Sequence, residues 1–329
     1  MKKILKSDLK CVPIQKMVFA KTNPGVKVND FAPRNVPGER LRGDEVLYVN
    51  DICYGDKYPN SHVDIWYENQ DRSVKRPTII YIHGGGFIFG DKVVGDPLAA
   101  GTGRDVDFCA EVAKRGYNVI SMNYALAPEY RFPVQVEQVD QMLGYLTMHQ
   151  ENLGLDMDNV FLGGGSAGAD LAEIYGVVLC NPDYAKRLGI KPSVRQEQIK
   201  GLLIDEAALD TTHFEENMNA MLGCWMGTDK LSQSPLADIM DATKWIEDKY
   251  ISSFINTSNQ EIWFVDSANA LAEVLKRVGT DYELFYREPE YDVLNHGYMQ
   301  LFASNIYAKE CFDHMLAFVE KKLREERAL

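Results

Sequence analysis

Residues 160–168 read Val-Phe-Leu-Gly-Gly-Gly-Ser-Ala-Gly, and this stretch decides the fold class. An apolar, strand-like run leads into Ser166, and the helix-prone run 169–175 follows directly. A serine on so sharp a strand-to-helix turn has a strained backbone, so small residues are needed at Gly164 and Gly168 for neighbouring segments to pass closely. The N-terminus of the following helix favours negative charge beside the serine. The motif predicts an exposed nucleophile, although Gly-x-Ser-x-Gly also occurs by chance in glycine-rich turns.

Strand-like and helix-like segments alternate along most of the chain. Between the strands, apolar residues recur at three- and four-residue spacing, which gives each helix one apolar face. Apolar strands that alternate with amphipathic helices predict an α/β fold with a mostly parallel sheet covered on both faces. The candidate strands are 45–53, 62–68, 78–82, 117–124, 159–163, 199–204, 250–256 and 281–286.

Two stretches do not follow this alternation. Residues 1–45 are polar and irregular, with Pro13 among the prolines that interrupt any long helix, and residues 181–249 are rich in methionine, tryptophan and polar residues. We expect 1–45 to form an N-terminal cap segment and 46–329 to form the main domain, with a cap insertion at about 181–249. Ligands bind at the carboxyl ends of the strands in open parallel sheets, so we expect the cap to cover that edge.

Composition excludes several classes of protein. The 329-residue chain has a formal net charge of −13, with 46% hydrophobic and 25% charged residues, which is typical of an acidic globular protein. Beyond the short tail at 321–327, no basic block favours nucleic acid, and no apolar run approaches the ~18 residues of a membrane span. The opening residues lack the apolar core of a signal peptide, and the six cysteines include no Cys-x-x-Cys pair. We therefore expect a cytoplasmic protein with reduced thiols, no metal site and no nucleic-acid partner.

A second glycine-rich motif, His83-Gly-Gly-Gly-Phe87, follows the candidate strand 78–82. Glycines let backbone N–H groups approach a ligand oxygen without obstruction by a Cβ atom, which an oxyanion hole requires. The alternative is a glycine-rich turn with a structural histidine, and the serine motif further along the chain makes that alternative weaker. Behind this loop lies a glycine- and aspartate-rich insertion at 92–107, which either borders an entrance or, as we favour, is a surface loop.

Four motifs in this order resemble the hormone-sensitive-lipase-like branch of the α/β-hydrolases, which are carboxylesterases and acetyl esterases. They are His-Gly-Gly-Gly-Phe at 83–87, Tyr-Ala-Leu-Ala-Pro-Glu-Tyr-Arg-Phe-Pro at 124–133, Gly-Gly-Ser-Ala-Gly at 164–168 and His-Gly-Tyr at 296–298. The resemblance covers roughly residues 55–320. It implies an eight-stranded, mostly parallel sheet, a helical cap from the N-terminus and a mid-chain insertion, a Ser-acid-His triad and no cofactor.

The resemblance also implies a role for each residue of the motifs. Ser166 would be the nucleophile and His296, in a glycine-flanked loop after the last strand, the general base. His83 would support the first glycine-rich loop, with Gly84, Gly164 and Gly168 as its structural neighbours, and the oxyanion hole would consist of the backbone N–H groups of Gly85, Gly86 and Ala167.

The acid of the triad is harder to place. The family ends its seventh strand with an aspartate in a short loop, and residues 254–266 lack that motif. Counting back from the helix predicted at 267–279 puts Glu261 at the catalytic position, with Asp266 as the alternative and the absence of a functional acid as a third possibility.

Three further acids, Asp205, Glu206 and Asp210, follow the candidate strand 199–204 near the same edge of the sheet. They either form a polar substrate pocket or give ordinary negative charge to a helix N-terminus, and we favour the second interpretation.

The sequence thus predicts a serine carboxylesterase that hydrolyses short-chain acyl esters, acetyl to butyryl, through an acyl-enzyme. The expected partner is a small-molecule acyl ester, without a cofactor or metal, and a homo-oligomer is compatible with the sequence. Two alternatives remain open: a non-catalytic ligand-binding protein on the same fold, and an amidase or peptidase with the same triad.

Overall fold

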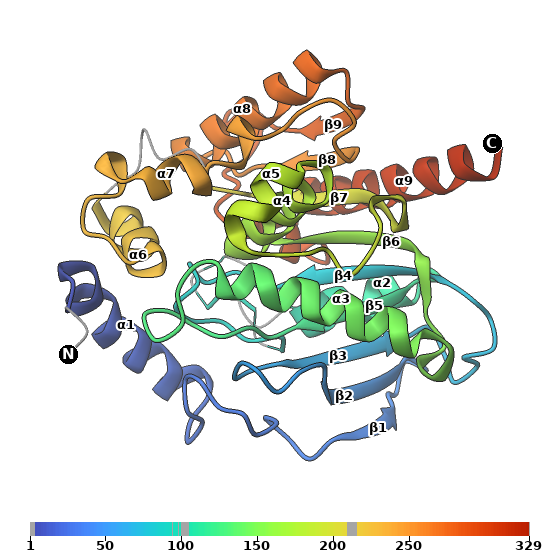
Figure 1. The fold of residues 1–329 in the computed structure, drawn as a ribbon. Coiled ribbons are helices and arrows are strands. Elements are labelled where there is room, and N and C mark those ends of the chain that lie inside the picture. The colour runs from blue at the N-terminus through green and yellow to red at the C-terminus, as the bar shows by residue number, and fades with distance from the viewer. Residues whose placement is uncertain (1–3, 94, 98, 100–104, 209–215, 329) are drawn as a thin grey trace.

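A nine-stranded sheet runs through the centre of the computed structural model, which describes residues 4–93, 95–97, 99, 105–208 and 216–328 (Figure 1). Its order is β1-β2-β3-β5-β4-β6-β7-β8-β9, antiparallel from β1 to β5 and parallel from β5 to β9. The predicted α/β class is confirmed. The strands are β1 (Gly38–Leu41), β2 (Leu47–Cys53), β3 (His62–Tyr67), β4 (Pro77–Ile82), β5 (Asn118–Met122), β6 (Asp156–Gly165), β7 (Ile199–Asp205), β8 (Ser253–Asn256) and β9 (Tyr282–Phe285).

Helices cover both faces of the sheet, because strand side chains alternate between two apolar clusters. On β4, Ile80 and Ile82 pack into one cluster, and Ile79 and Tyr81 pack into the other. The first cluster includes α3 (Val134–Leu153), α4 (Ala167–Cys180) and α8 (Ile262–Val278), and the second includes α2 (Asp105–Ala113) and α9 (Ile306–Ala328). Shorter helices are α5 (Pro182–Leu188), α7 (Pro235–Met240), η1 (Gln196–Gln198), η2 (Leu231–Gln233), η3 (Ala242–Lys244) and η4 (Tyr298–Leu301).

The N-terminal segment is more regular than the sequence predicts. Residues Lys6–Thr22 form α1 despite Pro13 within it, and β1 adds a ninth strand to the eight that we expected. Packing explains the helix, because Cys11, Val18 and Phe19 are buried in the first apolar cluster and offset the proline's missing hydrogen bond.

Helix α1 lies against α6 (Glu216–Met226), as Figure 1 shows at one end of the sheet. Arg131 joins the two helices: one guanidinium nitrogen donates to the Asp8 carboxylate at 2.8 Å, and another donates to the backbone carbonyl of Cys224. The range 181–249, which we expected to be a cap insertion, also contains β7 of the central sheet.

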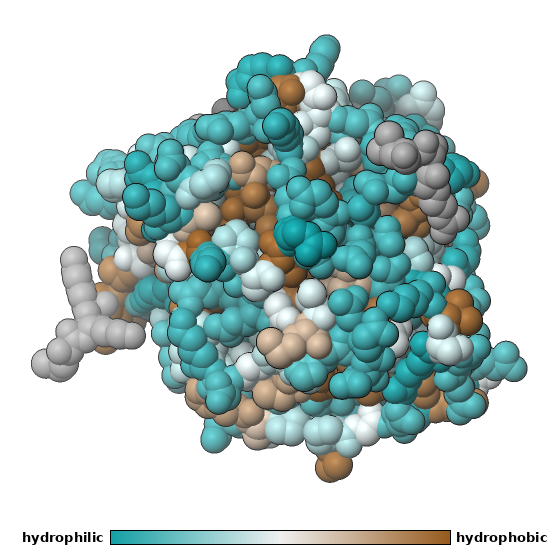
Figure 2. Space-filling model, turned by 45° about the vertical axis from the view of Figure 1, so that its right-hand side comes forward, coloured by the Kyte–Doolittle hydropathy of each residue, from teal (hydrophilic) through white to brown (hydrophobic). Residues whose placement is uncertain are grey.

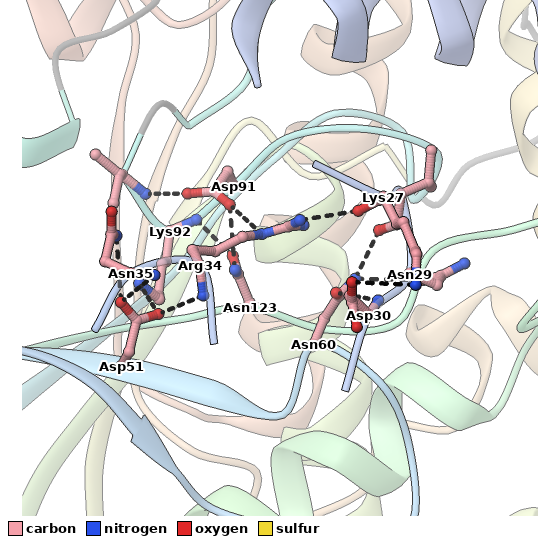
Figure 3. A network of polar contacts seen from close by, with 12 residues as sticks. Lys27, Asn29, Asp30, Arg34, Asn35, Asp51, Asn60, Asp91, Lys92 and Asn123 are labelled. Carbon is pink, nitrogen blue, oxygen red and sulfur yellow. Dashed lines mark hydrogen bonds and ion pairs between the residues drawn. The ribbon is translucent and has the colours of Figure 1, made fainter. Parts of the chain in front are cut away.

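A buried ion network anchors the chain behind the first glycine-rich loop (Figure 3). The Lys92 side chain is fully buried, and its Nζ lies 3.0 Å from Asp51 Oδ1 and 2.7 Å from Asp64 Oδ1. Burial alone would lower the pKa of Lys92, but the surrounding carboxylates outweigh it and raise that pKa above its ordinary value. Next to Lys92, Asp91 pairs with Arg34 at 3.2 Å. The network therefore joins β2 and β3 to the segment that leaves the loop.

The surface is mainly hydrophilic on the face shown in Figure 2, with apolar residues in small separate areas. Among the described residues, no helix has both the length and the apolar character that a membrane crossing requires.

Candidate active site

Ser166 lies on the sharp turn between β6 and α4. Its backbone has φ 52° and ψ −120°, a conformation that a residue with a side chain adopts only under strain. A Cβ atom at Gly164 would lie 2.3 Å from the carbonyl oxygen of Ile82, and one at Gly168 would lie 1.9 Å from the same oxygen. Only glycine fits at these two positions. The turn is held from the other side by the Ser166 N–H, which donates to the Asp205 carbonyl at 2.8 Å.

The loop after β4 runs beside this turn and turns sharply at two glycines. Gly85 and Gly86 have φ of +102° and +57°, and a Cβ atom at Gly85 would lie 2.3 Å from the Phe89 carbonyl oxygen. Neither backbone N–H of these two glycines donates to another residue that the structure describes. Ala167 is the first residue of α4, where a backbone N–H has no acceptor within the helix. The arrangement offers three amides for an anionic oxygen.

His83 is buried beneath the loop. Its Nδ1 lies 2.8 Å from the Gly84 carbonyl oxygen, and its ring stacks on Tyr124 at a centroid distance of 4.3 Å. Burial lowers the pKa of His83 to about 4, so the imidazole is neutral at pH 7. In this position His83 supports the loop and is not placed for proton transfer.

His296 precedes η4 and lines the same cavities as Ser166. Its ring stacks on Phe264 at 4.4 Å, and a carboxylate faces each of its two nitrogens. Glu206 Oε2 contacts Nδ1 and also accepts a hydrogen bond of 2.6 Å from the Gly297 N–H, while Asp96 Oδ2 lies 3.4 Å from Nε2. Burial alone would lower the pKa of His296, but the two carboxylates outweigh it and raise that pKa well above its ordinary value.

The structure thus brings Glu206 to the imidazole, in place of Glu261 or Asp266. Glu206 follows the last residue of β7, and β7 pairs directly with β6, the strand that leads to Ser166, so the Glu206 side chain lines the same cavity as Ser166. Glu261 is instead the N-cap of α8, and Asp266 lies further along that helix. Glu261 and Asp266 follow β8, which lies one strand further from β6 than β7 does.

A signal for Glu206 was present in the sequence. It directly follows an apolar strand, at the carboxyl edge where a parallel sheet gathers its functional residues, and it comes between Ser166 and His296 in the chain, as the acid does in α/β-hydrolases. Contrary to what we expect from the sequence, Glu206 does not supply charge to a helix N-terminus, because its carboxylate contacts His296 Nδ1. Asp210 lies outside the described residues.

Two further acids, Asp170 and Asp205, are buried near His296. Burial and the neighbouring Glu206 carboxylate raise the pKa of Asp205 to about 7. A hydrogen bond of 2.7 Å from the Asn256 amide N–H to Asp205 acts in the opposite direction but does not outweigh them. Burial likewise raises the pKa of Asp170 to about 7, and this carboxylate accepts a hydrogen bond of 2.6 Å from the Ala208 N–H. The site is therefore dense in carboxyl groups.

Comparison with known proteins places the chain in a family. Residues 63–271 match the BD-FAE family. The chain belongs to the BD-FAE family. As a BD-FAE member it is similar over half its length to bovine arylacetamide deacetylase, with 34% identity over 174 residues, and similar to Arabidopsis thaliana carboxylesterase 20, with 34% identity over 151 residues. The first match covers 50% of this chain and the second 44%, but each covers only 40% of the relative.

Solved structures show the same fold at low sequence identity. Esterase B from Lactobacillus rhamnosis superimposes with a TM-score of 0.73 at 18% identity, covering 97% of this chain and 94% of that one. A hyperthermophilic esterase from Pyrobaculum calidifontis gives a TM-score of 0.67 at 16% identity, covering 96% of this chain and 93% of that one. The BD-FAE chain therefore has an α/β-hydrolase fold.

Two cavities flank Ser166 in this BD-FAE chain. The smaller, of about 20 Å³, lies toward Glu206, His296 and Gln300. The larger, of about 180 Å³, is lined by Gly86, Phe89, Asp96, Ser166, Met221, Glu261, Trp263, Phe264 and His296. Asp96 lines both cavities and belongs to the 92–107 insertion, which we expected to be a surface loop. In the part of the chain that the structure describes, no cluster of three or more histidine, cysteine or acidic side chains is arranged to hold a metal ion.

Proposed function

We propose that the chain is a serine carboxylesterase of short-chain acyl esters, with Ser166 as nucleophile, His296 as general base and Glu206 as the acid. One observation carries the proposal: a strained serine at the strand-to-helix turn shares its cavity with a histidine whose other nitrogen contacts a buried carboxylate. The names of the relatives, carboxylesterase and acetyl esterase among them, support the same chemistry.

The chemistry would proceed in two halves. Ser166 Oγ attacks the ester carbonyl carbon while His296 Nε2 takes the hydroxyl proton, and the same proton then passes to the leaving alkoxide. The remaining acyl-enzyme is hydrolysed when His296 takes a proton from water and returns it to Ser166. Glu206 holds the imidazole in the required tautomer and stabilises the imidazolium.

The amides of Gly85, Gly86 and Ala167 would stabilise the tetrahedral intermediate. The negative charge develops on the former carbonyl oxygen, at the start of α4, where the helix dipole also favours an anion. Removal of one such donor typically costs about 3 kcal/mol of transition-state stabilisation.

The cap would set the size of the acyl group. Met221 of α6 lines the larger cavity and would meet a Cβ atom at Gly86 within 2.5 Å, so α6 closes this side of the site. With α6 closing this side, the space around the scissile bond is limited, which is in keeping with a short acyl group of the acetyl-to-butyryl range. We propose that α1 and α6, joined by Arg131, form the cap.

An amide substrate is the second candidate, because one relative is named arylacetamide deacetylase. The same triad serves esters and amides, which differ in the leaving group that His296 must protonate. Turnover of a p-nitroanilide against the matching p-nitrophenyl ester separates the two.

Stopped-flow hydrolysis of p-nitrophenyl acetate by the wild type and by Ser166→Ala tests the proposal. We expect a burst of about one equivalent of nitrophenolate in the wild type, none in the variant, and falling kcat/KM for acyl chains longer than butyryl. A folded wild-type protein without turnover would contradict the proposal and favour a non-catalytic ligand-binding protein.

A further inference from the structure

Apart from His296, the described charged side chains that line the two cavities beside Ser166 are all carboxylates. Asp96, Asp205, Glu206 and Glu261 all line them, whereas no lysine or arginine does so among the residues that the structure describes. Asp205, Glu206 and Asp96 all have partners in the protein. Asp96 and Glu261 are the two that line the larger cavity.

Glu261 has a carboxylate oxygen without a protein donor. Its Oε2 is fully enclosed and accepts no hydrogen bond from any described residue, although the side chain lines the cavity. A carboxylate with an enclosed oxygen that has no donor carries poorly compensated negative charge, and a positive charge bound in the cavity would lower that cost through its electrostatic attraction.

Aromatic rings complete the walls. Phe89, Trp263 and Phe264 line the cavity together with the two carboxylates. Faces of aromatic rings attract cations, and tryptophan does so most strongly, so rings and carboxylates together suit an organic ammonium group. The cavity of about 180 Å³ far exceeds the roughly 10–15 Å³ that one water needs, so it has room for such a group.

Asp96 links this cavity to the general base. Its Oδ2 lies 3.4 Å from His296 Nε2, the nitrogen that must accept the Ser166 proton. A cationic group in the cavity would give Asp96 a different partner. His296 Nε2 would then be available to accept the proton of the Ser166 hydroxyl.

We propose that the larger cavity binds a positively charged group, through Asp96, Glu261 and the aromatic walls, and that the protein prefers esters that carry an ammonium group close to the scissile bond. This inference rests on the proposed esterase function. It assigns Glu261 a role in substrate specificity instead of the catalytic role that the sequence suggested.

A matched substrate pair tests the inference. Acetylthiocholine and S-(3,3-dimethylbutyl) thioacetate have the same shape and differ in a quaternary nitrogen that replaces a carbon, and release of thiol reports hydrolysis of both. We expect kcat/KM to favour the cationic thioester by about tenfold in the wild type. Glu261→Gln should reduce that preference to about twofold, because it removes the charge and keeps the shape.

Glu273→Gln is the control, because Glu273 is an exposed acid on the same helix, α8, and should keep the wild-type preference. Calorimetry with tetramethylammonium gives a second readout that needs no turnover, and binding should weaken about tenfold in Glu261→Gln.

The outcomes separate the inference from the esterase proposal. Hydrolysis of both thioesters at equal rates, or a preference that Glu261→Gln leaves intact, overturns the inference and leaves the esterase standing. Hydrolysis of neither contradicts the esterase proposal, and the calorimetric comparison still decides whether the cavity binds a cation.

Discussion

At the scale of single residues, the contact between Asp96 and His296 predicts the pH dependence of activity. The carboxylates facing His296 raise its pKa. Because only the neutral imidazole can accept a proton, kcat/KM should rise with pH through that raised pKa. Removing the charge of Asp96 lowers that pKa, while Glu206, Asp205 and Asp170 remain near the ring. Asp96→Asn should therefore move the acidic limb of the kcat/KM profile for p-nitrophenyl acetate to lower pH. A limb at the same pH in both proteins would contradict this role of Asp96.

Asp170 predicts a pH dependence of stability. Its pKa is about 7 in the folded protein and roughly 3.9 in the unfolded chain, so the folded state binds more protons between these values and loses stability as pH rises through them. Between pH 5 and pH 8 the loss is on the order of 2–3 kcal/mol. Asp170→Asn keeps an acceptor for the Ala208 N–H and should remove this part of the pH dependence. Urea unfolding at pH 5 and pH 8 measures this change in the free energy of unfolding. The same change in the wild type and in Asp170→Asn would contradict the prediction.

At the scale of elements, the turn between β6 and α4 requires glycine. A Cβ atom at Gly168 would lie 1.9 Å from a carbonyl oxygen of β4, so Gly168→Ala must push α4 away from the sheet. We expect a loss of about 3 kcal/mol or more in the free energy of unfolding. Gly43→Ala is the matched control, because nothing lies within 4 Å of a Cβ atom there, and chemical denaturation compares the two. Equal stability of the two variants would show that the turn can relax.

Some strands of the sheet could be located from the sequence, and others could not. Apolar runs located β4 and β7 to within a residue or two, because buried parallel strands have continuous hydrophobic sequences. Strand β1 has no such signal, since its four residues are exposed and only pairing with β2 makes it a strand. The family resemblance implies a helical cap from the N-terminus, but the local sequence does not locate α1, because Pro13 opposes a helix there and burial of one face against the core decides the outcome.

The serine turn and the glycine-rich loop at 83–87 could be predicted as local structures for a different reason. Each is a local structure that requires glycine at particular positions, so a few consecutive residues determine its geometry. The pairing of His296 with Glu206 joins residues far apart in the chain and depends on which strand lies next to β6. Spacing along the sequence does not contain that information.

At the scale of the whole molecule, the Lys92 network joins strands β2 and β3 to the segment that follows the glycine-rich loop at 83–87. Lys92→Met would leave Asp51 and Asp64 buried without their cation, and we expect a loss of about 3–5 kcal/mol in the free energy of unfolding. Lys309→Met breaks an exposed pair with Asp313 and should cost less than about 0.5 kcal/mol. Guanidinium unfolding compares the variants. Equal losses would mean that the buried network adds nothing to stability.

The measurement that tests the central claim most directly is covalent trapping with a p-nitrophenyl alkylphosphonate. Its phosphorus forms a bond to the serine oxygen as nitrophenolate leaves, and peptide mass spectrometry locates the adduct. We predict one adduct per chain on Ser166, formed at least about 100-fold more slowly in Glu206→Gln and within about threefold of the wild-type rate in Asp266→Asn. An adduct elsewhere, or equal trapping rates in Glu206→Gln and the wild type, would contradict the assignment of Ser166, His296 and Glu206 as the catalytic triad.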